Sequence, residues 1–298
     1  MAKTHFPRTG GQSWVTSFYE PGHTTGNVFY VSSSTGTSTG PGYSPETAFS
    51  TIDAAIGACT ASNGDVIYVM PGHTETVTGA AGVALDVAGV TIIGLGTGRQ
   101  RGKVNFTTAT AASFDISAAS CAVKNLVFTN AIDAQTAMIN VSAADVSIVD
   151  CEVQTGNAST QAVLGVLTTA SADRLVIEGC HFHGTVDAGT TAQIKIVGGD
   201  AIVIRGNILC GACATNGNLL NATTAATNLE VIGNFMLNQT ADGNNKNIVL
   251  DASTTGLIAD NRMAIIDSTG PAPVTAAGAY VSANYWTGAA GVTASTLM

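Results

Sequence analysis

Apolar residues recur along this chain at a nearly constant spacing. Seven six-residue segments, the first at residues 123–128 and the last at 281–286, share one order of aliphatic, variable, turn-forming and large apolar positions. Their fourth positions step by 25, 29, 27, 27, 27 and 23 residues and are Leu126, Cys151, Cys180, Asn207, Asn234, Asn261 and Asn284. An eighth copy lies upstream at residues 92–97. A fixed period of this length, built on short β-like runs, predicts a solenoid of stacked coils.

Each position of the repeat has its own expected role. The first is aliphatic in every copy and the sixth is mostly large and apolar, so both should point inward. The second varies freely, as an outward position should. The third is Asn, Asp, Gly or Ala, mostly residues that tolerate a left-handed backbone, which marks a bend. The fourth, with two cysteines followed by four asparagines, predicts an internal ladder of side-chain amides bonded from coil to coil.

A further short apolar run precedes the bends, at residues 114–119, 139–144, 194–199 and 249–253. Each coil should therefore hold two or three short strands joined by turns of small residues. Parallel stacking at about 4.8 Å per coil gives a rod of roughly 40 Å. We therefore predict an all-β fold, a single-stranded parallel β-helix of about eight coils. Its ends need caps, because each coil buries its apolar column only against its neighbours.

A helical pattern near the start of the chain supplies one such cap. Its apolar face consists of Ala48, Ile52, Ala55, Ile56 and Cys59. Ser44 followed by Pro45 is a plausible cap and first helical residue. We expect an N-terminal arm at residues 1–27, a β-helix at 28–288 with a cap helix near 46–59, and a C-terminal tail at 289–298.

The amino-acid composition fits this fold and reduces the range of expected binding partners. Of the 298 residues, 45% are hydrophobic, only 10% are charged and 34 are glycine, which suits coils joined by small-residue turns. The net charge of −9 and the scattered basic residues disfavour nucleic acid as a ligand. The sequence contains neither an apolar run of membrane-spanning length nor the start of a secretory signal. We therefore expect no membrane association, synthesis in a cytoplasm, and six cysteines that need not pair.

Two stretches carry a resemblance to a known family. Residues 30–56, YVSSSTGTSTGPGYSPETAFSTIDAAI, followed by residues 64–77, GDVIYVMPGHTETV, resemble the entry module of pectin-lyase-like right-handed parallel β-helix proteins. The resemblance implies the right-handed coil. Together with residues 94–104, GLGTGRQRGKV, these stretches also look like β-helix proteins of tailed bacteriophages, which include capsid decoration proteins, fibres and tailspikes. That likeness implies a homotrimer in the virion, assembled in the host cytoplasm, with the major capsid protein as partner.

The outward columns offer little for catalysis. Glycosidases use two carboxylates roughly 5–10 Å apart. The fifth column contains a single acid and reads Val127, Glu152, His181, Ile208, Phe235, Arg262 and Tyr285. We expect Glu152–His181 and Glu178–Arg205 to be surface pairs, each worth under about 1 kcal/mol. Asp150 and Asp260 should form turns, while the loop acids lie several coils apart at Asp133, Asp187 and Asp242. We predict no enzyme and no catalytic residue.

The sequence contains residues that could form a metal or cofactor site, but we do not predict one. The cysteines and histidine that could bind zinc are Cys180, His183, Cys210 and Cys213. Structural zinc sites usually show two paired motifs, and strand alternation should place Cys180 inward and His181 outward. The glycines of residues 94–98 lack the helix of a dinucleotide-binding loop and should form a turn between coils. We therefore expect neither a metal nor a cofactor.

Two groups of residues are candidates for contact with a partner. Trp14, Phe18 and Tyr19 lie in the arm, which is either a disordered terminus or an attachment segment. Arg99, Arg101 and Lys103 form either a solvated loop or a charged contact with an acidic neighbouring subunit. We expect a capsid decoration or cement protein. The alternatives are a receptor-binding tailspike, with or without polysaccharide depolymerase activity, and a bacterial polysaccharide lyase.

Overall fold

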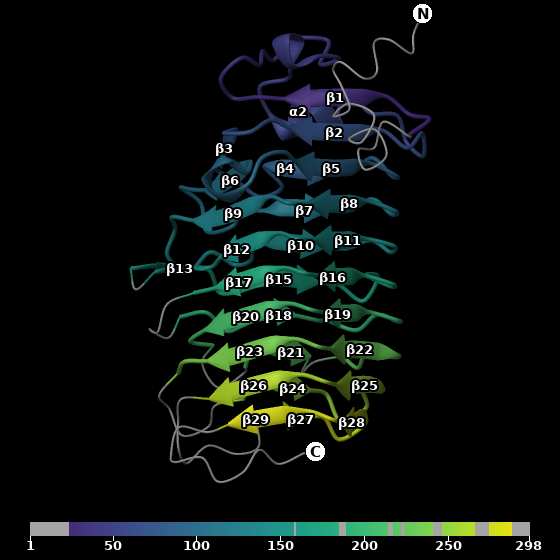
Figure 1. The fold of residues 1–298 in the computed structure, drawn as a ribbon, viewed down its shortest axis with the longest axis vertical. Coiled ribbons are helices and arrows are strands. Elements are labelled where there is room, and N and C mark those ends of the chain that lie inside the picture. Colours follow the sequence, from purple (N-terminus) through teal and green to yellow (C-terminus); the bar gives the residue numbers. More distant parts are fainter. Residues whose placement is uncertain are drawn as a thin grey trace, which may run out of the picture.

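The chain forms one column of stacked coils with three parallel sheets (Figure 1). The computed structural model describes residues 24–157, 159–184, 189–213, 217–221, 224–240, 246–265 and 274–287. Within them, sheet A has ten strands, sheet B nine and sheet C eight. In Figure 1 the strands of sheet A lie on the right and those of sheet B on the left. The predicted fold class, an all-β parallel β-helix, is confirmed.

The strands of each sheet follow one another along the stack. Sheet A contains β1 (Val28–Val31), β2 (Val66–Val69), β5 (Thr91–Gly94), β8 (Ala122–Lys124), β11 (Ser147–Val149), β16 (Val176–Glu178), β19 (Val203–Arg205), β22 (Leu229–Ile232), β25 (Gly256–Ala259) and β28 (Tyr280–Ser282). Sheet B contains β3 (Thr74–Val77), β6 (Lys103–Phe106), β9 (Val127–Asn130), β12 (Glu152–Gln154), β17 (His181–His183), β20 (Ile208–Gly211), β23 (Phe235–Asn238), β26 (Arg262–Ile265) and β29 (Tyr285–Thr287). Sheet C contains β4 (Val83–Leu85), β7 (Phe114–Ile116), β10 (Ile139–Val141), β15 (Leu164–Thr168), β18 (Ala192–Lys195), β21 (Leu219–Asn221), β24 (Ile248–Leu250) and β27 (Val274–Thr275). A small hairpin, β13 (Gly156–Asn157) with β14 (Thr160–Gln161), projects from the stack.

Backbone register follows the sequence repeat. Ile177 pairs with Ile148 on one side and with Ile204 on the other. Phe182 pairs with Leu209 in the same way in sheet B. All five side chains are fully buried, so the first and sixth positions of the repeat do point into a common core. In sheet C the predicted runs that begin at Phe114, Ile139 and Ile194 share one register position. Only the run assigned from residue 249 begins one residue earlier, with Ile248 as the inward residue of β24.

The third position of the repeat is a left-handed bend. Its φ lies between 53° and 66° in all seven copies, at Asn125, Asp150, Gly179, Gly206, Gly233, Asp260 and Ala283. The turn-forming roles expected of Asp150 and Asp260 are therefore confirmed. The upstream copy differs, because Gly94 ends β5 and the left-handed residue is Gly96, at φ 88°.

The fourth position forms the predicted ladder. Backbone N–H groups of Asn207, Asn234 and Asn261 donate to the side-chain oxygen of the next asparagine at 2.9, 3.0 and 3.0 Å, ending at Asn284. The side-chain amides also donate to first-position carbonyls of the preceding coil at 2.8–2.9 Å. Cys180 continues the ladder, since its N–H donates to Asn207 Oδ1 at 2.8 Å. These groups are buried, and each of these hydrogen bonds satisfies a polar group that would otherwise lack a partner in the core.

The helix expected from Ser44 onward is divided into two pieces. A 3₁₀ turn, η3 (Pro45–Thr47), is followed by a five-residue helix, α2 (Ile52–Ile56), capped by Thr51. Phe49 between them is extended, because its N–H donates to Tyr30 O and its carbonyl accepts from Ser32 N–H, both at 2.8 Å. The prediction of one helix near 46–59 was therefore too long.

Helix α2 closes the N-terminal end of the core. Its residues Ile52, Ala55 and Ile56 are buried against the first coils. Glu75 occupies an inward position of β3, and its Oε2 accepts the N–H of Ile52 at 2.8 Å. His73 Nε2 lies 3.3 Å from the same oxygen. A carboxylate that meets the first N–H groups of a helix stabilises it, so Glu75 fastens the cap to the first coil.

Asp65 fixes the loops beside the cap. Its Oδ1 accepts from Asn27 N–H at 2.6 Å and from Asn63 Nδ2 at 2.7 Å, while Oδ2 accepts from Thr60 N–H at 2.6 Å. Burial alone would raise the pKa of Asp65, but the hydrogen bonds from Thr60 and Asn27 outweigh it and lower the pKa below its usual value. The carboxylate is therefore ionised at neutral pH and joins residue 27, just before β1, to the loop at residues 60–65.

Candidate functional site

The outward side of sheet B carries one side chain per coil from the fifth position of the repeat. We call this set the outer column: Lys103, Val127, Glu152, His181, Ile208, Phe235, Arg262 and Tyr285. The adjacent residues along these strands, such as Phe128 and Phe182, fill the core, so strand alternation turns the column away from it. Polar residues dominate its middle, and apolar and aromatic ones dominate its C-terminal half.

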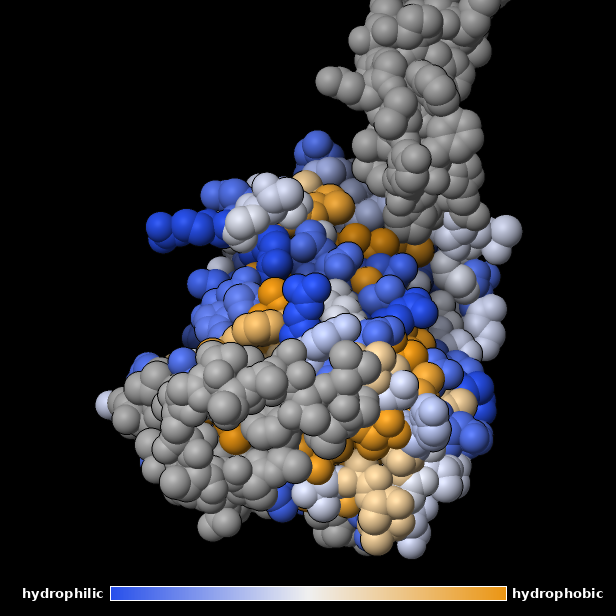
Figure 2. All heavy atoms as spheres, turned by 60° about the horizontal axis from the view of Figure 1, so that its bottom comes forward, coloured by the Kyte–Doolittle hydropathy of each residue, from blue (hydrophilic) through white to orange (hydrophobic). Residues whose placement is uncertain are grey.

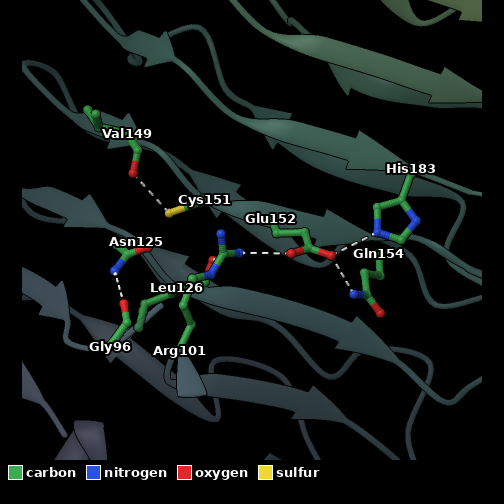
Figure 3. Close-up of polar contacts among 9 residues, drawn as sticks. All are labelled: Gly96, Arg101, Asn125, Leu126, Val149, Cys151, Glu152, Gln154 and His183. Atoms are coloured by element: carbon green, nitrogen blue, oxygen red, sulfur yellow. Dashed lines mark hydrogen bonds and ion pairs between the residues drawn. The ribbon is translucent and has the colours of Figure 1, made fainter. Parts of the chain in front are cut away.

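Glu152 is the centre of a polar cluster (Figure 3). Arg101 Nη2 donates to Glu152 Oε2 at 3.0 Å. His183 Nε2 and Gln154 Nε2 reach the other oxygen at 3.0 and 2.6 Å. The rings of His181 and His183 lie next to each other, with centroids 5.0 Å apart. An ionised carboxylate only accepts hydrogen bonds, so Nε2 of His183 carries a proton in this arrangement.

The cluster keeps Glu152 ionised. Partial burial raises the pKa of Glu152, but hydrogen bonds from His183 and Gln154 and the charge of Arg101 bring it below its usual value. Burial lowers the pKa of His181, and the charge of His183 adds to this effect. A general acid needs a raised pKa, so Glu152 is unsuited to protonating a leaving group at neutral pH.

Arg101 reaches this cluster from outside the repeat. It follows η4 (Gly98–Gln100) in the segment between β5 and β6, where the glycine-rich stretch forms the turn expected from the sequence. Asn125 holds this segment in place, because its Nδ2 donates to Gly94 O at 2.8 Å. The same Nδ2 donates to Gly96 O at 3.1 Å (Figure 3). The bend residue of one coil thus positions the arginine that meets the carboxylate of the next.

The C-terminal half of the outer column is apolar and exposed. Exposed fractions are 43% for Ile208, 43% for Phe235 and 46% for Tyr285. Arg262 lies between the two aromatic residues and is exposed as well. Figure 2, turned so that the C-terminal end of the stack comes forward, shows apolar side chains set among polar ones on the surface. Exposed apolar residues that line up in this way are typical of an interaction surface.

The structure corrects one predicted ion pair and confirms another. Glu178 and Arg205 lie 2.9 Å apart on the outward side of sheet A, as expected. Glu152 was expected to pair with His181, its direct register neighbour, and this was wrong. The carboxylate instead reaches diagonally to His183, on the neighbouring strand β17 two residues beyond His181, and to Arg101, and both offer it hydrogen-bond donors.

Only some of the residues predicted to contact a partner lie among the described residues. Trp14, Phe18 and Tyr19 lie outside the described residues, as do the loop acids Asp187 and Asp242. Arg99 is exposed in η4 and Lys103 is exposed at the start of β6. Arg101 is only 18% exposed at its side chain, because it pairs with Glu152 of its own chain. Contact of these residues with a partner stays a prediction.

The thiols of the chain are buried or half-buried. The six cysteines are free, and Cys151 and Cys180 lie in the inward fourth column. Contact with Cys151 and burial raise the pKa of Cys180, and burial raises the pKa of Cys213 to about 12. In the part of the chain that the structure describes, no group of three His, Cys, Asp or Glu side chains is placed to hold a metal ion.

A second line of charges lies at the turns that lead into sheet A, and the sequence pattern did not reveal it. Asp145, Asp173 and Asp200 lie at the turns of successive coils: Asp145 N–H donates to Asp173 O, and Asp200 N–H donates to Asp173 Oδ1, both at 2.8 Å. Arg174 pairs with Asp145 at 2.6 Å and lowers its pKa. These residues lie outside the six-residue repeat: Asp173 and Asp200 each lie six residues before their bends at Gly179 and Gly206, whereas Asp145 lies five before Asp150, so no single offset would have found all three.

The chain was compared with known proteins. No protein-family model matches it, and no curated protein matches it. Among solved structures it is similar to a rhamnogalacturonan lyase, with 12% identity, a TM-score of 0.41 and coverage of 87% of both chains. It is also similar to the pectin methylesterase from Aspergillus niger in deglycosylated form, with 15% identity, a TM-score of 0.42 and coverage of 91% of both chains. Such values carry no information about activity, and the fold follows from the chain's own sheet register.

Among the described residues, no helix is long and apolar enough to cross a membrane.

Proposed function

We propose that this chain is a structural protein of a tailed-bacteriophage virion, a capsid decoration or cement protein that binds the major capsid protein. The observation that carries the proposal is the outer column, which displays Ile208, Phe235 and Tyr285 at the surface of a rigid stack. A rigid scaffold presents such a surface with little ordering cost on binding. The resemblance of residues 30–56, 64–77 and 94–104 to phage β-helix proteins supplies the kind of partner.

The proposal assigns no catalytic step to the chain. Glu152, the acid of the outer column, is held by Arg101 and His183, and its lowered pKa does not suit a general acid. A purified protein that cleaves oligosaccharides, with loss of cleavage in Glu152→Gln, would overturn this part of the proposal.

A receptor-binding tailspike is the second candidate. The same face carries the aromatic rings of Phe235 and Tyr285 in one column with the polar groups of Glu152 and His181. Aromatic faces next to hydrogen-bonding groups also suit a glycan surface.

Location in the virion separates the two candidates. Antibodies raised against the purified chain and labelled with gold should bind the heads of virions whose genome encodes it. Label confined to the tail tip would overturn the decoration proposal and favour the tailspike. The homotrimer that the resemblance implies is tested separately, by the mass of the purified protein in analytical ultracentrifugation.

A further inference from the structure

The pair Asn63–Gly64 lies in the loop between α2 and β2, outside the coil repeat. Asparagine is a thermolabile residue, and it loses its amide most readily before glycine, which has no Cβ to shield the backbone nitrogen. The sequence contains the same pair once more, at Asn216–Gly217, and Asn216 lies outside the described residues. Asn63 is therefore the asparagine of this kind whose surroundings the structure shows.

The backbone nitrogen that follows Asn63 is available for reaction. Asn63 is exposed, Gly64 has a left-handed backbone with φ +78°, and among the described residues the Gly64 N–H meets no acceptor. The asparagines of the ladder differ. Asn207 is buried, and the N–H that follows it, of Ile208, donates to Cys180 O at 2.9 Å. The sheet thus occupies the nitrogen after a ladder asparagine, whereas the nitrogen after Asn63 has no such bond.

Deamidation at this pair is a ring closure followed by hydrolysis. The Gly64 nitrogen bonds to Cγ of Asn63 and gives up its proton, the Cγ–Nδ2 bond breaks, and ammonia leaves. One water then opens the cyclic imide at either carbonyl, which leaves aspartate or isoaspartate at position 63. Nothing is oxidised or reduced, and water is the only co-reactant.

The amide that this reaction removes holds Asp65. Asn63 Nδ2 donates to Asp65 Oδ1 at 2.7 Å, and the same oxygen accepts the Asn27 N–H at 2.6 Å. Asp65 is buried and ionised, and its other oxygen accepts the Thr60 N–H. A carboxylate at position 63 cannot donate a hydrogen bond, and its charge repels that of Asp65.

Asp65 connects the start of the first strand to the rest of the stack. Asn27 directly precedes β1, and the Thr24 hydroxyl donates to Gly64 O in the same loop. Strand β1 is the end strand of sheet A and pairs only with β2. A change at position 63 therefore acts on the N-terminal end of the stack, while the later coils keep their own strand pairing.

From these observations we propose that Asn63 is a site of spontaneous deamidation, and that the new carboxylate repels Asp65 and loosens the segment before β1. The proposal goes beyond the proposed function and does not depend on it. The chemistry requires only water and time, so the altered form accumulates in the folded protein as it ages.

The first test follows the mass of the chain. Folded wild-type protein is incubated at mildly alkaline pH and digested with endoproteinase Asp-N, which cuts before aspartate and releases residues 53–64. We expect this fragment to gain the mass of the isoaspartate form, and a shorter fragment, residues 53–62, to appear from the aspartate form. Fragments that contain Asn207 should stay unmodified over the same time. Deamidation of Asn63 in urea but not in the folded protein would overturn the proposal.

The second test measures what the product does, with Asn63→Asp as its stable mimic. The matched control is Asn63→Ala, which removes the hydrogen bond to Asp65 without adding a charge. We expect Asn63→Asp to speed amide hydrogen exchange at Asn27 and Thr60 and to lower Tm by about 4 °C, with a smaller shift for Asn63→Ala. Exchange and Tm like those of wild type in Asn63→Asp, or equal shifts in the two variants, would overturn the repulsion that the proposal assigns to the product.

Discussion

The side-chain oxygen of Asn234 accepts both the backbone N–H and the side-chain amide of Asn207, at 2.9 and 3.0 Å. Asn234 repeats the arrangement with Asn261 on the next coil, at 3.0 and 2.9 Å. One side chain therefore satisfies two donors of its neighbour, and the bends of successive coils are joined inside the core. The stack is held at its corners by amide groups as well as by sheet hydrogen bonds.

Replacing Asn234 by alanine should lower the free energy of unfolding by about 2–3 kcal/mol, because the buried N–H of Asn207 loses its acceptor. Urea unfolding followed by circular dichroism measures the change. Glu230→Ala, on the exposed side of β22, is the control and should change stability by less than about 0.5 kcal/mol. Equal effects of the two substitutions would show that the ladder does not stabilise the core.

Asp65 should make stability depend on pH. Its pKa is lowered in the folded protein, so its contribution is complete above the ordinary aspartate value of about 4 and is lost as the pH falls through the lowered pKa. Asp65→Asn should cost about 2 kcal/mol at pH 7, since a charged acceptor of several hydrogen bonds is removed. Thermal unfolding from pH 7 to pH 2 should show the difference between wild type and variant shrinking below about pH 4. A difference that stays constant would contradict this account.

Glu75 should control the order of the cap. Glu75→Val removes the acceptor of the Ile52 N–H, whereas Glu75→Gln keeps an oxygen that can accept it. We expect Glu75→Val to destabilise the protein by about 2 kcal/mol and to speed amide hydrogen exchange across residues 51–57, with a smaller effect of Glu75→Gln. Exchange that is equally slow in wild type and Glu75→Val would mean that burial of Ile52 and Ile56 alone holds the helix.

The bend column allows a pair of opposite substitutions. A Cβ added to Gly206, at φ +63°, would meet no heavy atom within 4 Å, so Gly206→Ala should cost only the backbone term of about 1 kcal/mol. Ala283 already occupies this region, at φ +53°, and Ala283→Gly should stabilise by up to about the same amount. Chemical unfolding of the two variants should therefore move in opposite directions, and a shift in the same direction would rule out backbone strain as the cause.

The stack was predictable because one bend is repeated. The aliphatic first position and the turn-forming third position fixed the register of residues such as Ile148, Ile177 and Ile204, and their pairing follows it. The strands β15 and β21 were not among the runs picked out in the sequence. Their coils carry different segments between bends, so the column position does not repeat at a fixed offset.

The candidate site was harder to predict than the stack. The column order placed His181 beside Glu152, and the backbone register agrees. The atoms that meet are set by the direction of the side chains along the strand, which favours His183, and by Arg101, which comes from a segment outside the repeat. The period of a sequence determines which residues are neighbours, but not which neighbouring group a flexible carboxylate selects.

The bend-to-bend interval also makes length an adjustable quantity. Removing residues 205–231, one full period of 27, would join Ile204 to Ile232 and leave the first-to-second-position junction of the pattern unchanged. The shortened molecule would lose about 4.8 Å, one division of a molecular ruler. Gain or loss of whole windings can thus alter reach while the two ends keep their own chemistry.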